Sequence, residues 1–284
     1  MFKIVSKRCL TPNITEMKVL APKVAASAQP GQFIIVRTDE QGERIPLTIC
    51  DYDREAGTIT IVTQSIGISS QKICDMCEGD SFADFAGPLG RPTDLMDLPA
   101  EELRKKKILF VAGGVGTAPV YPQVKWLKEQ GVEADVIIGA KTKDIFTYVE
   151  EMRGVGNVYL CTDDGSEGFH GMVTGLMKKL VEEDGKKYDH CVIIGPMIMM
   201  KFAAMTTKEY GIPTMVSLNA LMVDGTGMCG ACRVTVDGET KFTCVDGPEF
   251  DGHKVDFDEA MRRQNMYRGH EKTNPETHKC KCHG

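Results

Sequence analysis

Three cysteines and one aspartate in the C-terminal part of the chain could bind metal. Their spacing is Asp224-x4-Cys229-x2-Cys232-x11-Cys244, starting in the glycine-rich stretch MVDGTGMCGACRVTVDG. Such a set allows three interpretations: half of a zinc site, a disulfide pair, or an iron-sulfur cluster with a carboxylate in place of one thiolate. A structural zinc site usually has two paired elbows, whereas Cys244 has no CxxC partner. Glycines would let backbone amides approach the sulfur atoms of a cluster.

A second group of residues has the form of a dinucleotide site. The segment LFVAGGVGTAP, residues 109–119, predicts a buried strand that ends in a glycine turn and leads into a helix. Glycines let the backbone approach a pyrophosphate, and the helix N-terminus offers free amides to it. Taken alone, such a turn often serves only tight packing. The candidate residues are Gly113, Gly114, Gly116 and Thr117.

Two later strand ends strengthen this interpretation. CTDDGSEGFHG, residues 161–171, places carboxylates at one strand end, and GPMIMM, residues 195–200, opens a helix at another. A doubly wound sheet binds a dinucleotide where such ends face one crevice. Most of the methionines in the second segment are expected to be core residues. The candidates added here are Asp163, Asp164, Gly195, Pro196 and Met197.

Complementary motifs occur in the first hundred residues. RIPLTI, residues 44–49, places a hydroxyl on a strand beside an arginine and a proline, and GPLGRP, residues 87–92, follows later. SIGISSQ, residues 65–71, leads from a strand end into a helix and could form a second anion cradle. Each motif alone would pass for an ordinary strand or turn. The candidates are Arg44, Pro46, Leu47, Thr48, Ile66, Gly67, Ser69 and Ser70.

The elements that position these residues predict a β barrel plus an α/β domain. Short strands with a period of two, separated by turns rich in Gly, Pro and Asp, predict an antiparallel barrel over residues 1–98. Buried strands then alternate with helices, which predicts a doubly wound parallel sheet over residues 99–215. The cysteine region, residues 216–252, would form a small domain of its own. Residues 253–284 would be a C-terminal extension.

Composition excludes several classes of protein. The chain of 284 residues has 42% hydrophobic residues, as in ordinary soluble proteins. A net charge of -6 and a pI near 5.6 disfavour nucleic-acid binding. No apolar run is long enough to span a bilayer and the N-terminus lacks a signal core, so we expect a cytoplasmic protein without a membrane partner. In that compartment the eleven cysteines should not form a disulfide framework.

Other cysteines show no comparable pattern. Cys74 and Cys77 form a CxxC on a predicted helix over residues 68–79, and we interpret them as packing residues. Four single cysteines in apolar or strand-like segments are expected to be small buried hydrophobes: Cys9, Cys50, Cys161 and Cys191. A polar tail could bind metal, contact a partner or have no role; its ligand-like residues are His278, Cys280, Cys282 and His283.

Taken in order, RxPLT, IGxSS, GPLG, GGVGTAP, TDDGSxGxxG and GPMxMM resemble the ferredoxin-NADP reductase superfamily, from about Phe2 to Tyr210. In that family an antiparallel FAD-binding barrel precedes a nicotinamide-binding domain, and hydride passes between the two rings. The resemblance implies that Thr48 lies near the flavin nitrogen that takes the hydride. The segment 66–70 would hold the flavin pyrophosphate. The turn at 113–119 would bind NAD(H), beside the two later strand ends.

Two positions depart from the family pattern. The family usually has its arginine directly before the proline of the flavin motif, whereas Ile45 separates Arg44 from Pro46. This leaves open whether Arg44 contacts a flavin phosphate. Ile194 replaces a cysteine that commonly precedes the GP pair near the nicotinamide, so no thiol is expected there.

The cysteine region is similar to that of the electron-transfer subunit of dihydroorotate dehydrogenase, which has a cysteine in the first position and binds a [2Fe-2S] cluster. This similarity implies a cluster held by Asp224, Cys229, Cys232 and Cys244. It favours the cluster over zinc, because a one-electron centre suits a chain that also carries a flavin reductase pattern.

A narrower resemblance combines RIPLTI, Asp224 and the segment FTCVDGPEFDGHKVDFDEAMRRQ, residues 242–264. These features resemble the small subunits of electron-bifurcating NADH-dependent reduced ferredoxin:NADP oxidoreductases. That implies an oxidoreductase subunit passing electrons between a [2Fe-2S] cluster, FAD and NAD(H). Its partner would be a large subunit with a second FAD and [4Fe-4S] clusters, forming a heterodimer that reaches ferredoxin and NADP(H) through the partner.

Two alternatives remain at this point. The chain could be the electron-transfer subunit of an NAD-dependent dihydroorotate dehydrogenase, which has the same cofactors and a pyrimidine-forming partner. It could also be a nucleotide- and zinc-binding regulatory module without redox turnover. The preference for NAD or NADP is open as well.

Overall fold

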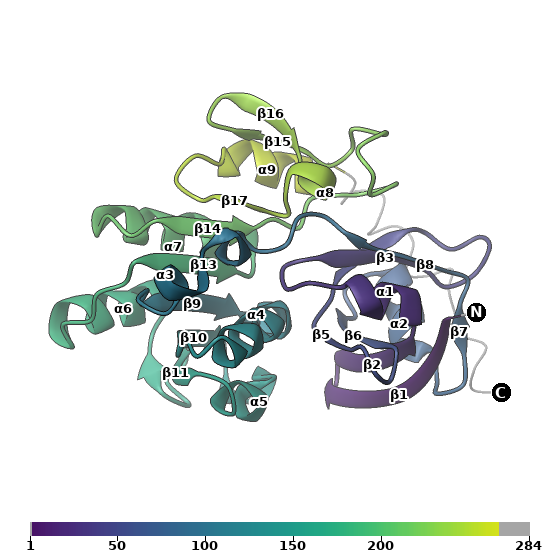
Figure 1. Ribbon diagram of the computed structural model, residues 1–284, viewed down its shortest axis with the longest axis horizontal. Coiled ribbons are helices and arrows are strands. Elements are labelled where there is room, and N and C mark those ends of the chain that lie inside the picture. The colour runs from purple at the N-terminus through teal and green to yellow at the C-terminus, as the bar shows by residue number, and fades with distance from the viewer. Residues whose placement is uncertain (1, 267–284) are drawn as a thin grey trace.

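The computed structural model describes residues 2–266 and consists of three parts (Figure 1). An antiparallel barrel contains the N-terminal strands, and a parallel sheet covered by helices follows it. A small lobe made of the last strands and helices lies against both. The predicted order of a barrel, an α/β domain and a C-terminal lobe is confirmed.

The barrel is built from two antiparallel sheets, with strand orders β5-β6-β2-β1-β7 and β4-β3-β8. Its core contains alternate residues from both sheets, such as Ile34 and Val36 of one and Ile59 and Ile61 of the other, as expected from the period of two. The strands are β1 (Phe2–Thr11), β2 (Ile14–Leu20), β3 (Phe33–Arg37), β4 (Ile45–Thr48), β5 (Asp51–Asp53), β6 (Thr58–Gln64), β7 (Ser81–Phe82) and β8 (Asp84–Leu89). The helices are α1 (Pro22–Ser27) and α2 (Ile68–Asp75).

A seven-stranded sheet forms the second part, with the order β12-β11-β10-β9-β13-β14-β17. Its strands are β9 (Ile108–Gly113), β10 (Asp135–Ala140), β11 (Asn157–Thr162), β12 (Phe169–His170), β13 (His190–Ile194), β14 (Thr214–Ser217) and β17 (Glu249–Asp251). All neighbours are parallel except β17, which pairs antiparallel with β14. The order reverses between β9 and β13, which is the point where doubly wound sheets bind ligands.

Helices cover both faces of this sheet. In β9, Leu109 and Val111 belong to the core on one face, whereas Phe110 and Ala112 belong to the core on the other. The two cores explain why these strands are continuous apolar runs. The helices are α3 (Ala100–Leu103), α4 (Thr117–Glu129), α5 (Val149–Arg153), α6 (Val173–Lys178) and α7 (Met197–Glu209). A 3-10 segment (Asp94–Asp97) lies in the linker, and a π-helical turn (Lys179–Glu183) extends α6.

The C-terminal lobe contains the hairpin β15 (Arg233–Val236) and β16 (Glu239–Phe242), with α8 (Thr243–Asp246) and α9 (Phe257–Gln264). The Asp256 side chain accepts a hydrogen bond from the Glu259 N–H at 2.9 Å and so caps α9. Phe257 and Ala260 then pack into the core of the parallel sheet. Because β17 also joins that sheet, the sheet contains strands from both of the predicted segments, 99–215 and 216–252.

Two predictions about cysteines were wrong. Cys9 is exposed, and Cys77 is exposed beyond the end of α2, which stops at Asp75 and not at Gly79. Cys50, Cys161 and Cys191 are buried as predicted. The tail residues His278, Cys280, Cys282 and His283 lie outside the described residues. Within residues 2–266 no helix has the length and apolar character needed to cross a membrane.

Candidate functional site

The four candidate metal ligands form two pairs. The Cys229 thiol donates to Asp224 Oδ1 at 3.2 Å, and the Cys232 and Cys244 sulfur atoms are also 3.2 Å apart. No three histidine, cysteine or carboxylate side chains converge on one point anywhere in the described part of the chain. A tetrahedral zinc site needs four donors around one ion, whereas a [2Fe-2S] cluster takes two protein ligands on each of two irons. The two pairs match the two irons of a [2Fe-2S] cluster.

A glycine-rich loop shapes the first pair. Gly225 and Gly227 have φ angles of 79° and 86°, which side chains with a Cβ rarely adopt. The loop turns back on itself, so that Asp224 Oδ2 accepts the Met228 N–H at 2.9 Å. The hydrogen bond from Cys229 lowers the pKa of Asp224 to about 2, with further help from backbone N–H groups. The carboxylate is therefore ionised, as a metal ligand must be.

The second pair is buried between the lobe and the barrel. Cys232 and Cys244 share a small core with Phe33 and Ile35 of β3 and with Met222. Burial and then the contact with Cys232 raise the pKa of Cys244 to about 12. Bound iron would overcome this, because a coordinating thiol loses its proton to the charge of the metal.

The structure brings together the ends of β9 and β13, as predicted. A Cβ on Gly195 would lie 3.1 Å from the Gly113 nitrogen, and a Cβ on Gly116 would lie 2.3 Å from the Ile194 carbonyl oxygen. A Cβ on Gly113 would lie 2.3 Å from Met199 Sδ. Three of the predicted glycines are therefore required for close packing of the two turns at the switch point.

Gly114 differs from these three glycines. Its φ is +57° and its Cβ position has no atom within 4 Å, so this turn is open to a ligand. The Thr117 hydroxyl is buried and donates to the Gly114 carbonyl at 3.0 Å, which fixes the turn. Among the candidates of the strand-end group, Gly114 is the one whose backbone a pyrophosphate could approach most closely.

The remaining strand-end candidates divide into exposed and buried residues. Asp163 and Asp164 are exposed beyond β11, and hydrogen bonds from Ser166 lower the pKa of Asp164. Pro196 directly precedes α7 and is exposed. Met197 is 5% exposed and packs in the core of the sheet, in agreement with the general expectation for the methionine run.

The barrel motifs occupy one strand and one helix start. Thr48 ends β4 and is half-buried; within residues 2–266 its hydroxyl makes no hydrogen bond. Pro46 and Leu47 precede it on the same strand, where Leu47 packs against the barrel core. This leaves the Thr48 hydroxyl available to a ligand.

The helix start at α2 has the form of an anion cradle. Ser70 Oγ accepts the N–H groups of Ile66 and Gly67, each at 2.9 Å, while Ser69 donates to Glu43. A Cβ at Gly67 would meet open space, and Ile66 is 83% exposed. The backbone here is accessible, as a phosphate-binding turn requires.

Direct contacts hold the barrel against the parallel-sheet domain. Val115 of the glycine turn and Ala118 of α4 pack with the buried residues Ile14, Cys50 and Val62 of the barrel. Lys125 pairs with Asp51 at 2.8 Å, and Tyr148 donates to the buried Glu16. The glycine turn therefore faces the barrel near Cys50, which lies two residues after Thr48 in the chain.

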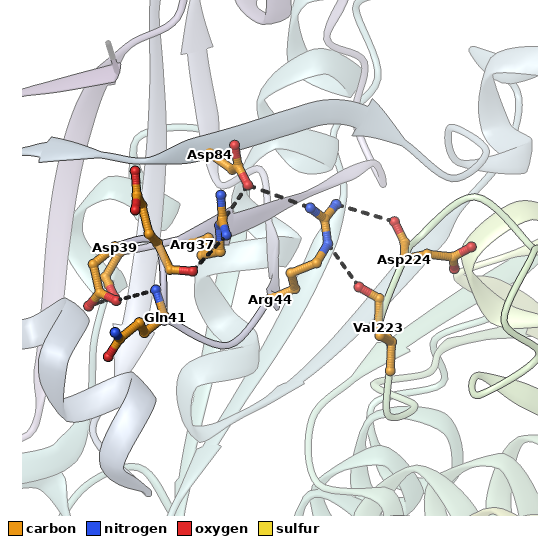
Figure 2. A network of polar contacts seen from close by, with 9 residues as sticks. Arg37, Asp39, Gln41, Arg44, Asp84, Val223 and Asp224 are labelled. Carbon is orange, nitrogen blue, oxygen red and sulfur yellow. Dashed lines mark hydrogen bonds and ion pairs between the residues drawn. The ribbon is translucent and has the colours of Figure 1, made fainter.

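Arg44 has a place that the sequence did not indicate. Its guanidinium reaches out of the barrel to the backbone of Val223 and Asp224, while Asp84 and Arg37 lie on its other side (Figure 2). The flavin motif and the candidate cluster loop are therefore in contact.

Sequence reasoning also missed a buried acid. Glu249 of β17 is 8% exposed and accepts a hydrogen bond from Gln123 of α4 at 2.6 Å. Burial, and then the nearby charge of Asp94, raise the pKa of Glu249 to about 7. The one available signal was an acidic residue beside Phe250 in the segment GPEFDG, which predicts no particular partner.

Comparisons with known proteins agree with this geometry. A family model for the iron-sulfur cluster binding domain of dihydroorotate dehydrogenase B matches residues 219–256. The chain is 61% identical to an uncharacterised protein in the adh 3' region of Clostridium beijerinckii, over 95% of this chain and 92% of that protein. It is 45% identical to a dihydroorotate dehydrogenase B (NAD(+)) electron transfer subunit homolog of Thermotoga maritima, over 95% and 93% of the two chains.

A solved structure extends the similarity to the whole fold. It belongs to a study of flavin-based electron bifurcation by the NADH-dependent reduced ferredoxin-NADP oxidoreductase, and matches with a TM-score of 0.90 and 42% identity over 97% of each chain. The resemblance predicted from the sequence is thereby confirmed. The chain belongs to the family of ferredoxin-reductase-like electron-transfer subunits that includes those of dihydroorotate dehydrogenase B and the NADH-dependent reduced ferredoxin-NADP oxidoreductase.

Proposed function

We propose that Asp224, Cys229, Cys232 and Cys244 hold the [2Fe-2S] cluster of an electron-transfer subunit whose other cofactors are FAD and NAD(H). The observation that carries this assignment is the arrangement of the four donors in two pairs, each 3.2 Å apart. The chain is an oxidoreductase subunit that passes electrons between the cluster, FAD and NAD(H).

The flavin would bind on the barrel. Thr48 would place its free hydroxyl at the flavin ring, and the exposed turn over residues 66–70 at the start of α2 would hold the pyrophosphate. Ser70 Oγ fixes this turn by accepting the Ile66 and Gly67 N–H groups. When bound, FAD exchanges electron pairs with a nicotinamide and single electrons with a cluster. Thr48 and the residues before it on β4 would orient the ring.

The nicotinamide dinucleotide would bind at the switch point of the parallel sheet. Gly113, Gly116 and Gly195 close the two turns on each other, and Gly114 leaves its backbone open to the pyrophosphate. Asp163 and Asp164 would lie to one side of this site, with Pro196 at the start of α7. In this arrangement a nicotinamide would face the barrel, against which Val115 packs.

As an electron-transfer subunit, the chain works with a large partner. We assign to that partner the second FAD, the [4Fe-4S] clusters and the contacts with ferredoxin and NADP(H), so the bifurcating step itself is not assigned to this chain. The cytoplasmic location expected from the sequence stays a prediction.

A second candidate function has specific support. The family model and the Thermotoga maritima relative both carry the description of dihydroorotate dehydrogenase B. The activity of the complex purified from its source organism decides between the two functions. Reduction of NADP by NADH together with reduced ferredoxin supports the bifurcating complex, whereas reduction of NAD by dihydroorotate supports the dehydrogenase.

The cofactor content of the anaerobically purified chain tests the proposal. We expect the chain to contain FAD. We also expect two iron atoms and two acid-labile sulfides per chain. Zinc without sulfide would contradict the cluster assignment and would favour a regulatory module.

A further inference from the structure

Arg44 connects the barrel to the loop that carries Asp224. Its Nε donates to the Val223 carbonyl at 3.0 Å, and its Nη2 makes a longer contact of 3.5 Å with the Asp224 carbonyl. Both acceptors are backbone atoms. Figure 2 shows that the Asp224 carboxylate points away from Arg44, so the arginine holds the peptide and leaves the carboxylate free for a metal.

The charge of Arg44 is only loosely paired. Asp84 lies 3.7 Å from Arg44 Nη1, but the same carboxylate oxygen is 2.7 Å from Arg37 Nε. Arg37 is therefore the closer partner of Asp84, and its second contact goes to the Glu40 carbonyl, within the barrel. Two arginines share one carboxylate, and Arg44 is the one turned toward the cluster loop (Figure 2).

A second contact supports the same seam between barrel and lobe. Gly225, the residue after Asp224, packs so closely on β3 and β8 that a Cβ would lie 2.4 Å from Ile35 Cδ1 and 3.0 Å from Leu89 Cδ1. The loop is thus held by an apolar contact on one side and by the guanidinium on the other. Arg44 also immediately precedes β4, the strand that ends at Thr48.

We propose that Arg44 is a positioning residue for the cluster ligand Asp224, and that its positive charge raises the reduction potential of the cluster. The proposal rests on the cluster assignment above. A cation beside a cluster favours the reduced state, which carries one more negative charge. Planar bidentate contacts of this kind suit a guanidinium and not an ammonium.

Redox titration of the purified, cofactor-loaded chain, monitored by EPR, tests the proposal, with FAD content measured in parallel. We expect Arg44→Gln to lower the midpoint potential of the cluster and to change its EPR g values while FAD is retained. Arg44→Lys should keep most of the potential, because the charge remains, and should still change the g values. Loss of iron from Arg44→Gln with FAD retained would also support positioning.

Arg37→Gln is the matched control, because it removes the other arginine that pairs with Asp84 and leaves the contacts of Arg44 with the loop in place. It should leave both the potential and the g values as in the wild type.

An unchanged potential and unchanged g values in Arg44→Gln would overturn the proposal. So would loss of FAD with an unaltered cluster, which would assign Arg44 to a flavin phosphate. If Arg44→Gln loses both cofactors, Arg44→Lys decides by the same readouts. A wild-type chain without any cluster signal would instead refute the proposed function.

Discussion

Cys232 and Cys244 place their sulfur atoms 3.2 Å apart at the buried seam between the lobe and the barrel. The first of them lies at the start of the β15–β16 hairpin and the second in α8, directly after it. The hairpin therefore joins one pair of candidate ligands, and the glycine-rich loop before it carries the other.

Replacement of Asp224 should empty the candidate cluster site. We expect Asp224→Ala to lose most of its iron and sulfide, because one iron would keep a single protein ligand, whereas Asp224→Cys should retain the cluster with a different potential. Iron and sulfide analysis measures both. Glu239→Ala is the control, since this exposed carboxylate of the same lobe pairs with Lys241 and, among residues 2–266, with no other cation. Full iron content in Asp224→Ala would show that the carboxylate is not a ligand.

Two glycines of the same turn should respond differently to alanine. Gly114→Ala meets open space, so its cost is the left-handed backbone, about 1 kcal/mol. It should raise the KM for NADH because the added methyl group obstructs the approach of the pyrophosphate. Gly116→Ala would clash with the Ile194 carbonyl and should lower the melting temperature by several degrees. Steady-state kinetics and thermal denaturation separate the two effects. Equal KM values in Gly114→Ala and the wild type would show that the dinucleotide binds elsewhere.

The Thr48 hydroxyl should matter for flavin reduction and not for folding. Thr48→Val removes the hydroxyl that we propose to bond the flavin, so we expect NADH to reduce the flavin about tenfold more slowly, with FAD still bound. Stopped-flow absorbance measures this rate. Thr48→Ser keeps the hydroxyl and should restore most of it. Equal rates of flavin reduction in Thr48→Val and the wild type would show that the Thr48 hydroxyl does not act in hydride transfer.

Buried Glu249 should make stability depend on pH. Its folded pKa of about 7 lies above the ordinary value of 4.5, so between these values the folded protein holds a proton that the unfolded chain has released. The free energy of unfolding therefore falls as pH rises through this window, by up to about 3 kcal/mol. Glu249→Gln should remove this part of the dependence and be relatively more stable at pH 8.

Melting temperatures at pH 5 and pH 8 measure the effect, and Glu133→Gln, at an exposed position, should behave as the wild type. The same pH dependence in wild type and Glu249→Gln would show that Glu249 is ionised in the folded protein.

Local pattern predicted much of this architecture. The period-two strands and the alternation after residue 107 gave the barrel and the parallel sheet, because both patterns follow directly from which faces are buried. The glycines at the strand ends could be predicted, because the sequence indicates a turn after each strand. Their division into packing residues and the open Gly114 was not predictable, because it depends on what lies opposite each Cβ position.

Contacts between distant segments could not be predicted. Arg44 and Val223 are 179 positions apart, and their contact exists because the lobe folds back on β3 and β8. Met197 was assigned to the dinucleotide site from its neighbours in sequence, but its helix turns it into the core. The partner of Glu249 lies on α4, 126 positions away.

The most direct test of the central claim is an anaerobic visible spectrum of the purified chain before and after NADH, with EPR on the reduced sample. We expect flavin bands that bleach on addition of NADH and a rhombic EPR signal from one reduced [2Fe-2S] centre. A colourless protein, or flavin that is reduced without any cluster signal, would contradict the proposed function.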